Sequence, residues 1–448
     1  MKSILIKNGT LIHSLGPRSE DILIQGEKIV RVGQNLQADS QTQVIDASGK
    51  LIFPGVIDPH THMGIPIKSG FSADDFARGS RSAIHGGVTT ILDFTVLEAG
   101  QSLSESLAIR SKAAEESLCD VGLHINITRY DSGILDEIPT LIQKGFNSFK
   151  VFTTYEESQM MLSYEQIESV AQIIGKHDGI LMVHSEDNTV ITKASEPYAE
   201  RTRREAKYHA LSRPADAESV AIRRLGEISE RSGCTIYIVH LNTEAGLEIA
   251  SEYPNLKVET CPHYLLLTDE VYEQEDGRMF VASPPLRKAA DQDALWQGIQ
   301  SGLVHTIGSD HCPFCVADKA QDTPFQDISN GMGGVETLFP TLLAQFIARG
   351  LDLSLLSRLT SANAAEIFGL DASKGAIEVE KDADLLIVDS AQILTNWKNL
   401  LHTSLDWNAY SEFPAIFPEF VIRRGEILAS PDYAQGVTLG KLLRASPR

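Results

Sequence analysis

The residues best suited to chemistry are histidines, acids and one lysine that follow short apolar runs. His60 and His62 lie one residue apart in the segment GVIDPHTHMGIP, residues 55–66. Successive strand residues point to opposite faces, so these two imidazoles share one face and can bind one metal ion. Thr61, between them, points the other way. The spacing therefore predicts one edge of a metal site at the end of a strand.

Similar side chains end several later apolar segments. They are Lys150, His184, His240 and Asp310. A single strand-end histidine is usually structural, but packing alone rarely repeats the pattern at the same end of five segments. Neutral imidazoles and a carboxylate suit divalent zinc, although iron, manganese or nickel can occupy the same atoms. We therefore expect His184, His240 and Asp310 to complete the ligand set that His60 and His62 begin.

Lys150 is the unusual member of this set, because an ammonium group repels metal cations and is costly to bury without a partner. One interpretation is that its head group reaches solvent at the strand end. The other is that its amine has reacted with carbon dioxide to form a carbamate. A carbamate is an anion that can bridge two metals about 3.5–4 Å apart, which between them hold a shared hydroxide.

Eight short apolar segments, separated by helical patterns, must position these residues. They are residues 55–62, 89–95, 121–128, 148–155, 179–186, 235–242, 257–264 and 305–311. Strands that alternate with helices favour a parallel sheet, and eight such units predict an α/β fold with a (β/α)8 barrel. In such barrels the chemistry lies at the carboxyl ends of the strands, where these polar residues fall.

The two ends of the chain show a different sequence pattern. Residues 1–52 and 373–428 read as short strands with Asn-Gly and Gly turns, which is typical of β-hairpins. We expect them to form one small, discontinuous β-sandwich domain, residues 53–372 to form the catalytic barrel, and residues 429–448 to form a tail.

Composition restricts the partners and the location. The formal net charge of −21 argues against a nucleic-acid or anionic-membrane partner. The chain shows no signal-peptide core and no apolar run long enough to span a bilayer. Five scattered cysteines suit reduced thiols better than a disulfide framework, so we expect a cytoplasmic protein.

Six motifs in this order resemble the amidohydrolase superfamily, most closely its hydantoinase/dihydropyrimidinase branch. They are DPHTH, SFKVFTTY, VHSED, IVHLNTEAG, SPPLR and IGSDHCPF, and the similarity spans residues 3–430. The resemblance implies two divalent metal ions, most simply Zn²⁺, bridged by an N6-carboxylated Lys150. It also implies that His60, His62 and Asp310 hold the more buried ion and that His184 and His240 hold the other. Members of this branch form homotetramers, or sometimes dimers.

The resemblance also implies a reaction, the ring opening of a small cyclic amide to an N-carbamoyl amino acid. A metal-bridging hydroxide attacks the amide carbonyl, and the Tyr155 hydroxyl stabilises the oxyanion. Asp310 then moves the proton to the leaving ring nitrogen. Ser283 and Asn330 match positions whose backbone groups hold the cyclic amide.

Three other functions are weighed against this one. Dihydroorotases carry Arg or Asn where this chain has Gly64, and allantoinases continue differently after the second histidine. Both remain as alternative cyclic-amide hydrolases. A non-catalytic scaffold, known among relatives, is disfavoured because every ligand position is retained.

Lys68 lies in the loop after His62. Its charge is either solvated or in contact with a polar substituent of the substrate ring.

Overall fold

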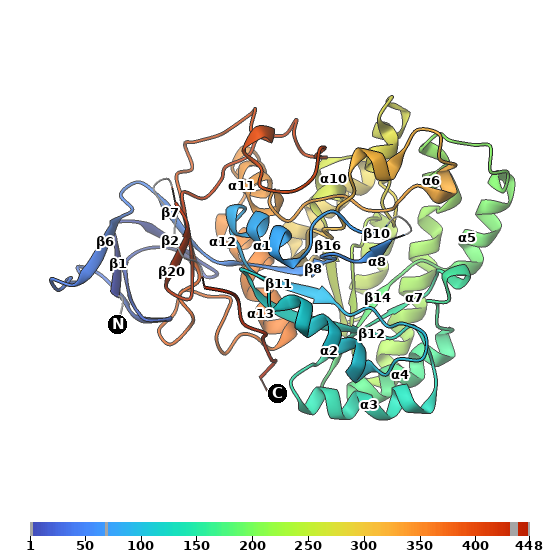
Figure 1. The fold of residues 1–448 in the computed structure, drawn as a ribbon, viewed down its shortest axis with the longest axis horizontal. Helices are drawn as coiled ribbons and strands as arrows, with labels where there is room; N and C mark the ends of the chain where they lie inside the picture. Colours follow the sequence, from blue (N-terminus) through green and yellow to red (C-terminus); the bar gives the residue numbers. More distant parts are fainter. Residues whose placement is uncertain (1–2, 68–69, 431–437, 447–448) are drawn as a thin grey trace.

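The computed structural model describes residues 3–67, 70–430 and 438–446, and the strands of a parallel sheet lie among the helices of its larger part (Figure 1). Eight parallel strands pair in chain order. They are β8 (Val56–Thr61), β11 (Val88–Phe94), β12 (Asp120–Asn126), β13 (Ser148–Phe152), β14 (Ile180–His184), β15 (Thr235–Ile238), β16 (Leu256–Thr260) and β17 (Thr306–Ile307). Each corresponds to one of the eight apolar segments of the sequence.

Bonds between the first and last strands close the ring just beyond β17. The His62 amide donates to the His311 carbonyl at 2.8 Å, and the Ser309 amide donates to Asp58 Oδ1 at 2.9 Å. Every residue of β8, β11 and β14 is buried, which is why these strands read as near-continuous apolar runs.

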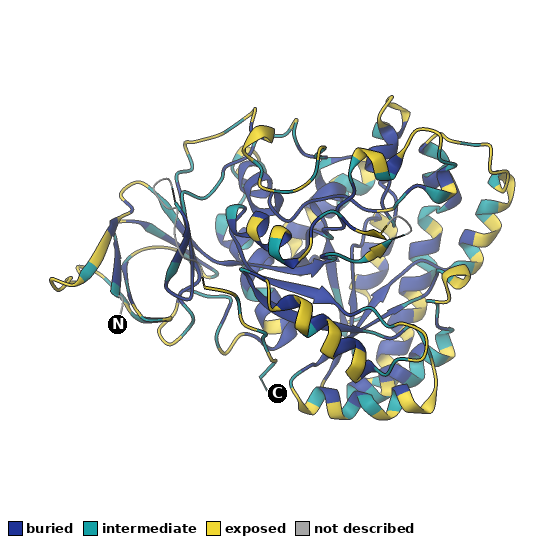
Figure 2. Ribbon diagram, in the orientation of Figure 1, coloured by how far each residue is buried: buried dark blue, intermediate teal, exposed yellow. Residues whose placement is uncertain are grey.

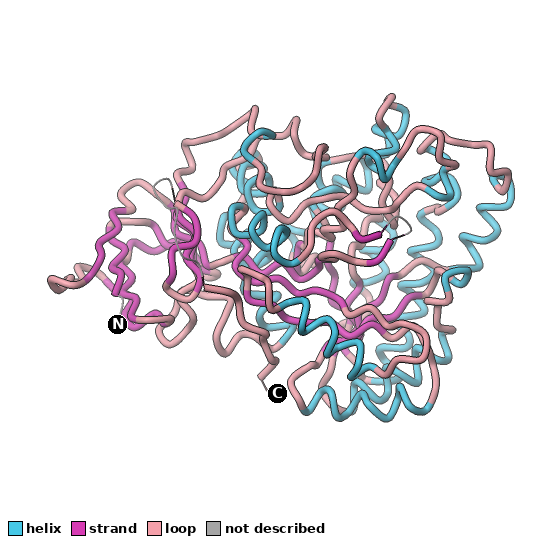
Figure 3. Tube along the Cα trace, in the orientation of Figure 1, coloured by secondary structure: helices cyan, strands magenta, loops and turns pink. Residues whose placement is uncertain are grey.

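Helices cover the outside of this barrel, with their exposed faces outward (Figures 2 and 3). The longer ones are α1 (Phe76–His85), α2 (Leu103–Ala114), α3 (Ser132–Gln143), α4 (Tyr164–Lys176), α7 (Ala215–Ser232), α10 (Ala289–Ser301) and α11 (Leu338–Ala348). The shorter ones are α5 (Asn188–Ser195), α6 (Lys207–Ser212), α8 (Glu244–Ser251), α9 (Pro262–Leu266), α12 (Leu353–Ser357) and α13 (Asn363–Phe368). Ser102 and Ser163 begin α2 and α4 with reciprocal capping boxes.

The two chain ends meet in a pair of sheets beside the barrel, where the blue and red strands of Figure 1 lie together. One sheet contains β1 (Ser3–Lys7), β4 (Asp21–Gln25), β5 (Lys28–Gly33) and β6 (Thr42–Asp46). The other contains β2 (Thr10–His13), β3 (Gly16–Ser19), β7 (Leu51–Pro54), β18 (Leu385–Val388), β19 (Phe420–Arg423) and β20 (Glu426–Ala429). Isoleucines from both sheets share one core. The predicted barrel with a β-sandwich from both ends is confirmed, while the exact domain boundaries stay predictions.

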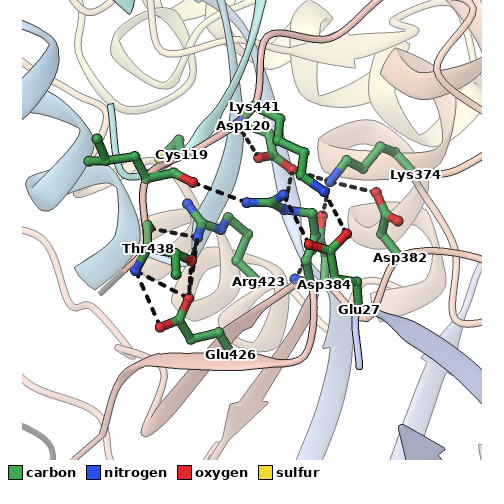
Figure 4. Close-up of polar contacts among 12 residues, drawn as sticks. Glu27, Cys119, Asp120, Lys374, Asp382, Asp384, Arg423, Glu426, Thr438 and Lys441 are labelled. Atoms are coloured by element: carbon green, nitrogen blue, oxygen red, sulfur yellow. Dashed lines mark hydrogen bonds and ion pairs between the residues drawn. The ribbon is translucent and has the colours of Figure 1, made fainter. Parts of the chain in front are cut away.

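A buried charged cluster joins the barrel to the terminal sheets (Figure 4). Lys374 Nζ lies 2.5 Å from Asp120 Oδ2, 2.7 Å from Asp384 Oδ2 and 3.0 Å from Asp382 Oδ2. The backbone amide of Lys441 donates to the other Asp120 oxygen at 2.8 Å. Asp120 begins β12 and Lys441 lies near the carboxyl terminus, so the cluster fixes three separate parts of the chain to one another.

A search of the described residues finds no helix whose length and apolar character would let it cross a membrane.

Candidate metal centre

The strand-end histidines and the aspartate meet at the carboxyl end of the barrel. His60 Nε2 lies 3.3 Å from Asp310 Oδ1, and His62 Nε2 lies 3.2 Å from the same oxygen. One ligand atom from each of the three side chains lies within 4.8 Å of the other two. His60 and Asp310 come from the first and last strands of the barrel, so closing the barrel is what brings these atoms together.

His184 and His240 extend the cluster from β14 and from the residues just after β15. Their ring centroids lie 4.6 Å apart, and the His240 ring stacks on His60 at 5.5 Å. Among the described residues, His240 Nδ1 has no hydrogen-bond partner although it is buried. The structure therefore brings together all five side chains that the sequence predicted as ligands.

Lys150 lies within this cluster and does not reach solvent, since only 2% of its surface is exposed. Its ammonium nitrogen lies 5.0 Å from the centre of the Phe94 ring, which also stacks on His62 at 5.0 Å. The described residues offer it no carboxylate within ion-pair distance. The observed burial rules out the interpretation in which this lysine extends to solvent.

Burial and the close histidines change the proton affinities of the site. Burial lowers the pKa of Lys150 to about 8, so more of its amine is neutral near pH 7 than in an exposed lysine. Burial alone would raise the pKa of Asp310, but His60 and His62 bring it well below its ordinary value. Burial also lowers the pKa of His184 and His240. These shifts favour neutral imidazoles beside an ionised carboxylate, which are the protonation states that bind metal.

Two buried glutamates hold ligand histidines in place, and sequence reasoning missed both. Glu259 Oε1 lies 2.7 Å from His60 Nδ1, and Glu186 Oε2 lies 2.7 Å from His184 Nε2. Both carboxylates are fully buried. The sequence contained a signal for each of them. Glu186 follows His184 by two residues, and Glu259 is an acidic residue within an otherwise apolar strand.

Three residues of the site have left-handed backbone conformations that non-glycine residues rarely adopt. The φ angles are +69° at Tyr155, +43° at His240 and +47° at Asp310. Each residue directly follows a barrel strand or lies within three residues of its end. Such backbone strain is concentrated at functional sites in proteins.

The residues expected to hold substrate lie near the candidate metal ligands. The Tyr155 ring lies 5.0 Å from the His184 ring, and Ser283 is one of the polar groups close to its hydroxyl. Asn330 is exposed on a neighbouring loop, whose Gly331 amide donates to the Val281 carbonyl at 3.0 Å. The two loops that carry Ser283 and Asn330 are therefore tied together next to Tyr155.

A buried lysine strengthens this tie. Lys319 Nζ donates to the carbonyls of Met279, Val281 and Gly331 at 2.9, 2.8 and 2.7 Å. Lys68, which the sequence suggested as a contact to a ring substituent, lies outside the described residues, and its role stays a prediction.

The donor set at the barrel mouth fits divalent metal. It offers imidazole nitrogens and a carboxylate oxygen at mutual distances that one ion can span, and it includes a second pair of imidazoles. The described residues contain one other acidic group with suitable spacing, formed by Asp120, Asp382 and Asp384. The ammonium of Lys374 already lies among those three carboxylates, so that group has its cation from the chain itself.

Comparison with known proteins gives consistent matches along the chain. A sequence model of the amidohydrolase family matches residues 51–422. The D-phenylhydantoinase of Escherichia coli strain SE11 is 33% identical over 458 aligned residues, which cover 99% of this chain and 98% of that protein.

Solved structures show the same similarity. The dihydropyrimidinase from Brevibacillus agri superposes with a TM-score of 0.95 at 29% identity, over 99% of each chain. The L-hydantoinase from Arthrobacter aurescens superposes with a TM-score of 0.90 at 26% identity, over 99% of this chain and all of that one. The similarity therefore includes both the barrel and the terminal sheets.

Proposed function

This chain belongs to the amidohydrolase family, in its hydantoinase/dihydropyrimidinase branch, and we propose that it opens the ring of a hydantoin-type or dihydropyrimidine-type cyclic amide by metal-dependent hydrolysis. The product is an N-carbamoyl amino acid. One observation carries this proposal: four histidines, an aspartate and a buried lysine from five different strands of the barrel converge at its carboxyl end.

The ligand set supports two zinc ions per chain. In this proposal His60, His62 and Asp310 hold the more buried ion, and His184 and His240 hold the other. Lys150 would complete this ligand set as an N6-carboxylated lysine, formed when its neutral amine adds carbon dioxide and releases a proton. Its burial among the ligands without a carboxylate partner supports this modification. When bound, the two ions supply Lewis acidity for the amide carbonyl and lower the pKa of the attacking water.

The side chains of the site supply positioning and proton transfer. The Tyr155 hydroxyl donates to the amide oxygen as negative charge develops there. Burial raises the pKa of Tyr155 to about 12, so the hydroxyl keeps the proton that it donates. Asp310 accepts a proton from the attacking water and delivers it to the ring nitrogen as the carbon–nitrogen bond breaks. Its low pKa is consistent with the ionised form that this first step requires.

Substrate recognition in this proposal selects an uncharged ring. Backbone groups at Ser283 and Asn330 bind the –CO–NH–CO– portion, which hydantoins and dihydropyrimidines share. Gly64 has a φ of +55°, and a Cβ atom added there would lie 3.4 Å from the Cα atom of Asp75. This conformation disfavours the Arg that pairs with a substrate carboxylate in dihydroorotases.

We expect hydantoin, 5-substituted hydantoins and dihydrouracil to be hydrolysed much faster than dihydroorotate. An unpaired carboxylate in a closing site is costly, and Gly64 supplies no partner for it. The measurement is kcat/KM for each compound with purified, zinc-loaded protein, and chiral analysis of the products reads out the stereochemical preference. Dihydroorotate turned over as fast as hydantoin would contradict the branch-specific part of this proposal.

Assembly and location complete the proposal. We propose a cytoplasmic homotetramer, or a dimer, that binds a small molecule and neither nucleic acid nor membrane. All five cysteines are unpaired, as suits a reducing compartment. Light scattering on a size-exclusion column measures the number of chains in the assembly.

A further inference from the structure

We propose that the buried ion pair between Glu186 and Arg213 is a positioning device that fixes the metal ligand His184 and the ring of Tyr155 in one rigid unit. This inference rests on the proposed function, because the role of His184 as a metal ligand and that of Tyr155 as a hydrogen-bond donor both come from it. Neither Glu186 nor Arg213 belongs to the expected ligand or substrate contacts, yet each touches one of those residues directly.

The contact with His184 decides which ring nitrogen is available for metal. His184 Nε2 donates to Glu186 Oε2 at 2.7 Å, so Nδ1 keeps its lone pair. His60 has the opposite arrangement, because its Nδ1 contacts Glu259 Oε1 at 2.7 Å and its Nε2 lies 3.3 Å from Asp310. A separate carboxylate therefore fixes the tautomer of a histidine in each half of the site.

Arg213 completes the unit from the other side. Its Nε atom lies 3.1 and 3.2 Å from the two Glu186 oxygens, and its guanidinium carbon lies 5.2 Å from the centre of the Tyr155 ring. The Arg213 carbonyl is itself held by Arg287 Nη1 at 2.6 Å. A planar guanidinium that binds a carboxylate and also lies over an aromatic ring fixes the orientation of both groups.

The location of the pair argues for a geometric role. Glu186 is fully buried, and taking such a pair out of water costs roughly as much free energy as the attraction between the charges returns. Stability alone is thus a weak reason for an ion pair here. The pair instead links the end of β14, which carries His184, to the loop after α6. This link keeps the His184 ring and the Tyr155 hydroxyl at a fixed distance and orientation.

The first test is Glu186→Gln, measured as zinc retained per chain when the zinc-loaded enzyme is dialysed against graded chelator. With its oxygen bound to Arg213, the new amide turns its NH2 toward His184 and favours the tautomer with a proton on Nδ1. We expect the dissociation constant of one of the two zinc ions to rise about 10–100-fold while the other ion is unaffected. Wild-type retention of both ions would overturn the proposal.

The second test is Arg213→Lys, which keeps the positive charge near Glu186 but removes the planar group beside Tyr155. We expect both zinc ions to be retained, KM to stay nearly constant, and kcat to fall by about tenfold or more, because the misplaced hydroxyl acts only in the transition state. An Arg213→Lys enzyme with wild-type kcat would overturn the coupling to Tyr155.

Glu168 and Arg231 provide matched controls. They form a comparable two-bonded pair, at 2.9 and 2.8 Å, on the outer surface of α4 and α7. Glu168→Gln and Arg231→Lys should leave zinc retention and kcat unchanged.

These tests separate failure of the inference from failure of the proposed function. Wild-type protein that binds zinc but hydrolyses no cyclic amide would contradict the function, whereas the zinc retention of Glu186→Gln relative to wild type still tests the positioning of His184.

Discussion

Lys150→Ala should reduce the hydrolysis of hydantoin to background and leave at most one zinc ion per chain. The reason is that Lys150 supplies the only protein anion proposed to lie between the two ions, and two cations at short distance repel each other without such a group. The alanine also leaves space beside Phe94 that small carboxylates can enter, so acetate added with zinc should restore part of the activity. Metal analysis and turnover of the same sample are the required measurements.

Lys257→Ala is the matched control for this variant. Lys257 lies in β16, but it is half-buried and away from the cluster of ligands. It should retain wild-type turnover and two zinc ions. A Lys150→Ala enzyme with near-normal turnover and metal content would show that no carbamate bridge exists.

Asp310→Asn should lower kcat by about 10²–10⁴-fold, the range typical for loss of a general acid–base group. The amide keeps the shape of the side chain but cannot accept and return the proton. The low pKa of Asp310 means that the wild-type carboxylate is ionised throughout the neutral range, so ionisation of this group should add no pH dependence to the wild-type kcat between pH 6 and 8. Rates are compared at equal zinc occupancy.

A loss smaller than tenfold in the Asp310→Asn enzyme at full zinc occupancy would transfer the proton-moving role to another group. His263, also buried at the barrel mouth, is the residue to test next.

Much of the candidate ligand cluster was predictable because two local patterns place its residues. Apolar runs of strand length mark the barrel strands, and side-chain alternation places His60 and His62 on one face. Closure of the barrel then brings Asp310 to the same point, a consequence of the fold and not of local sequence. The structure places the side chains of His60, His62, His184, His240 and Asp310 together, while their role as metal ligands stays a prediction.

The groups around the ligands could not be predicted in the same way. Glu259 lies 199 residues from His60 in the sequence, and Arg213 follows a short helix outside the barrel. Neither contact has a local spacing that identifies it, because each depends on how separate loops pack. For the same reason, the hairpin pattern predicted strands at both chain ends, but not that β7 would pair with β18 across more than 300 residues.

The most direct test of the central claim is the dependence of hydantoin hydrolysis on bound zinc. Protein stripped by chelator and reloaded in steps should regain activity that reaches its maximum at two zinc ions per chain, with N-carbamoylglycine as the product. Undiminished hydrolysis after complete metal removal, or no hydrolysis of hydantoin and dihydrouracil at two zinc ions per chain, would contradict the account.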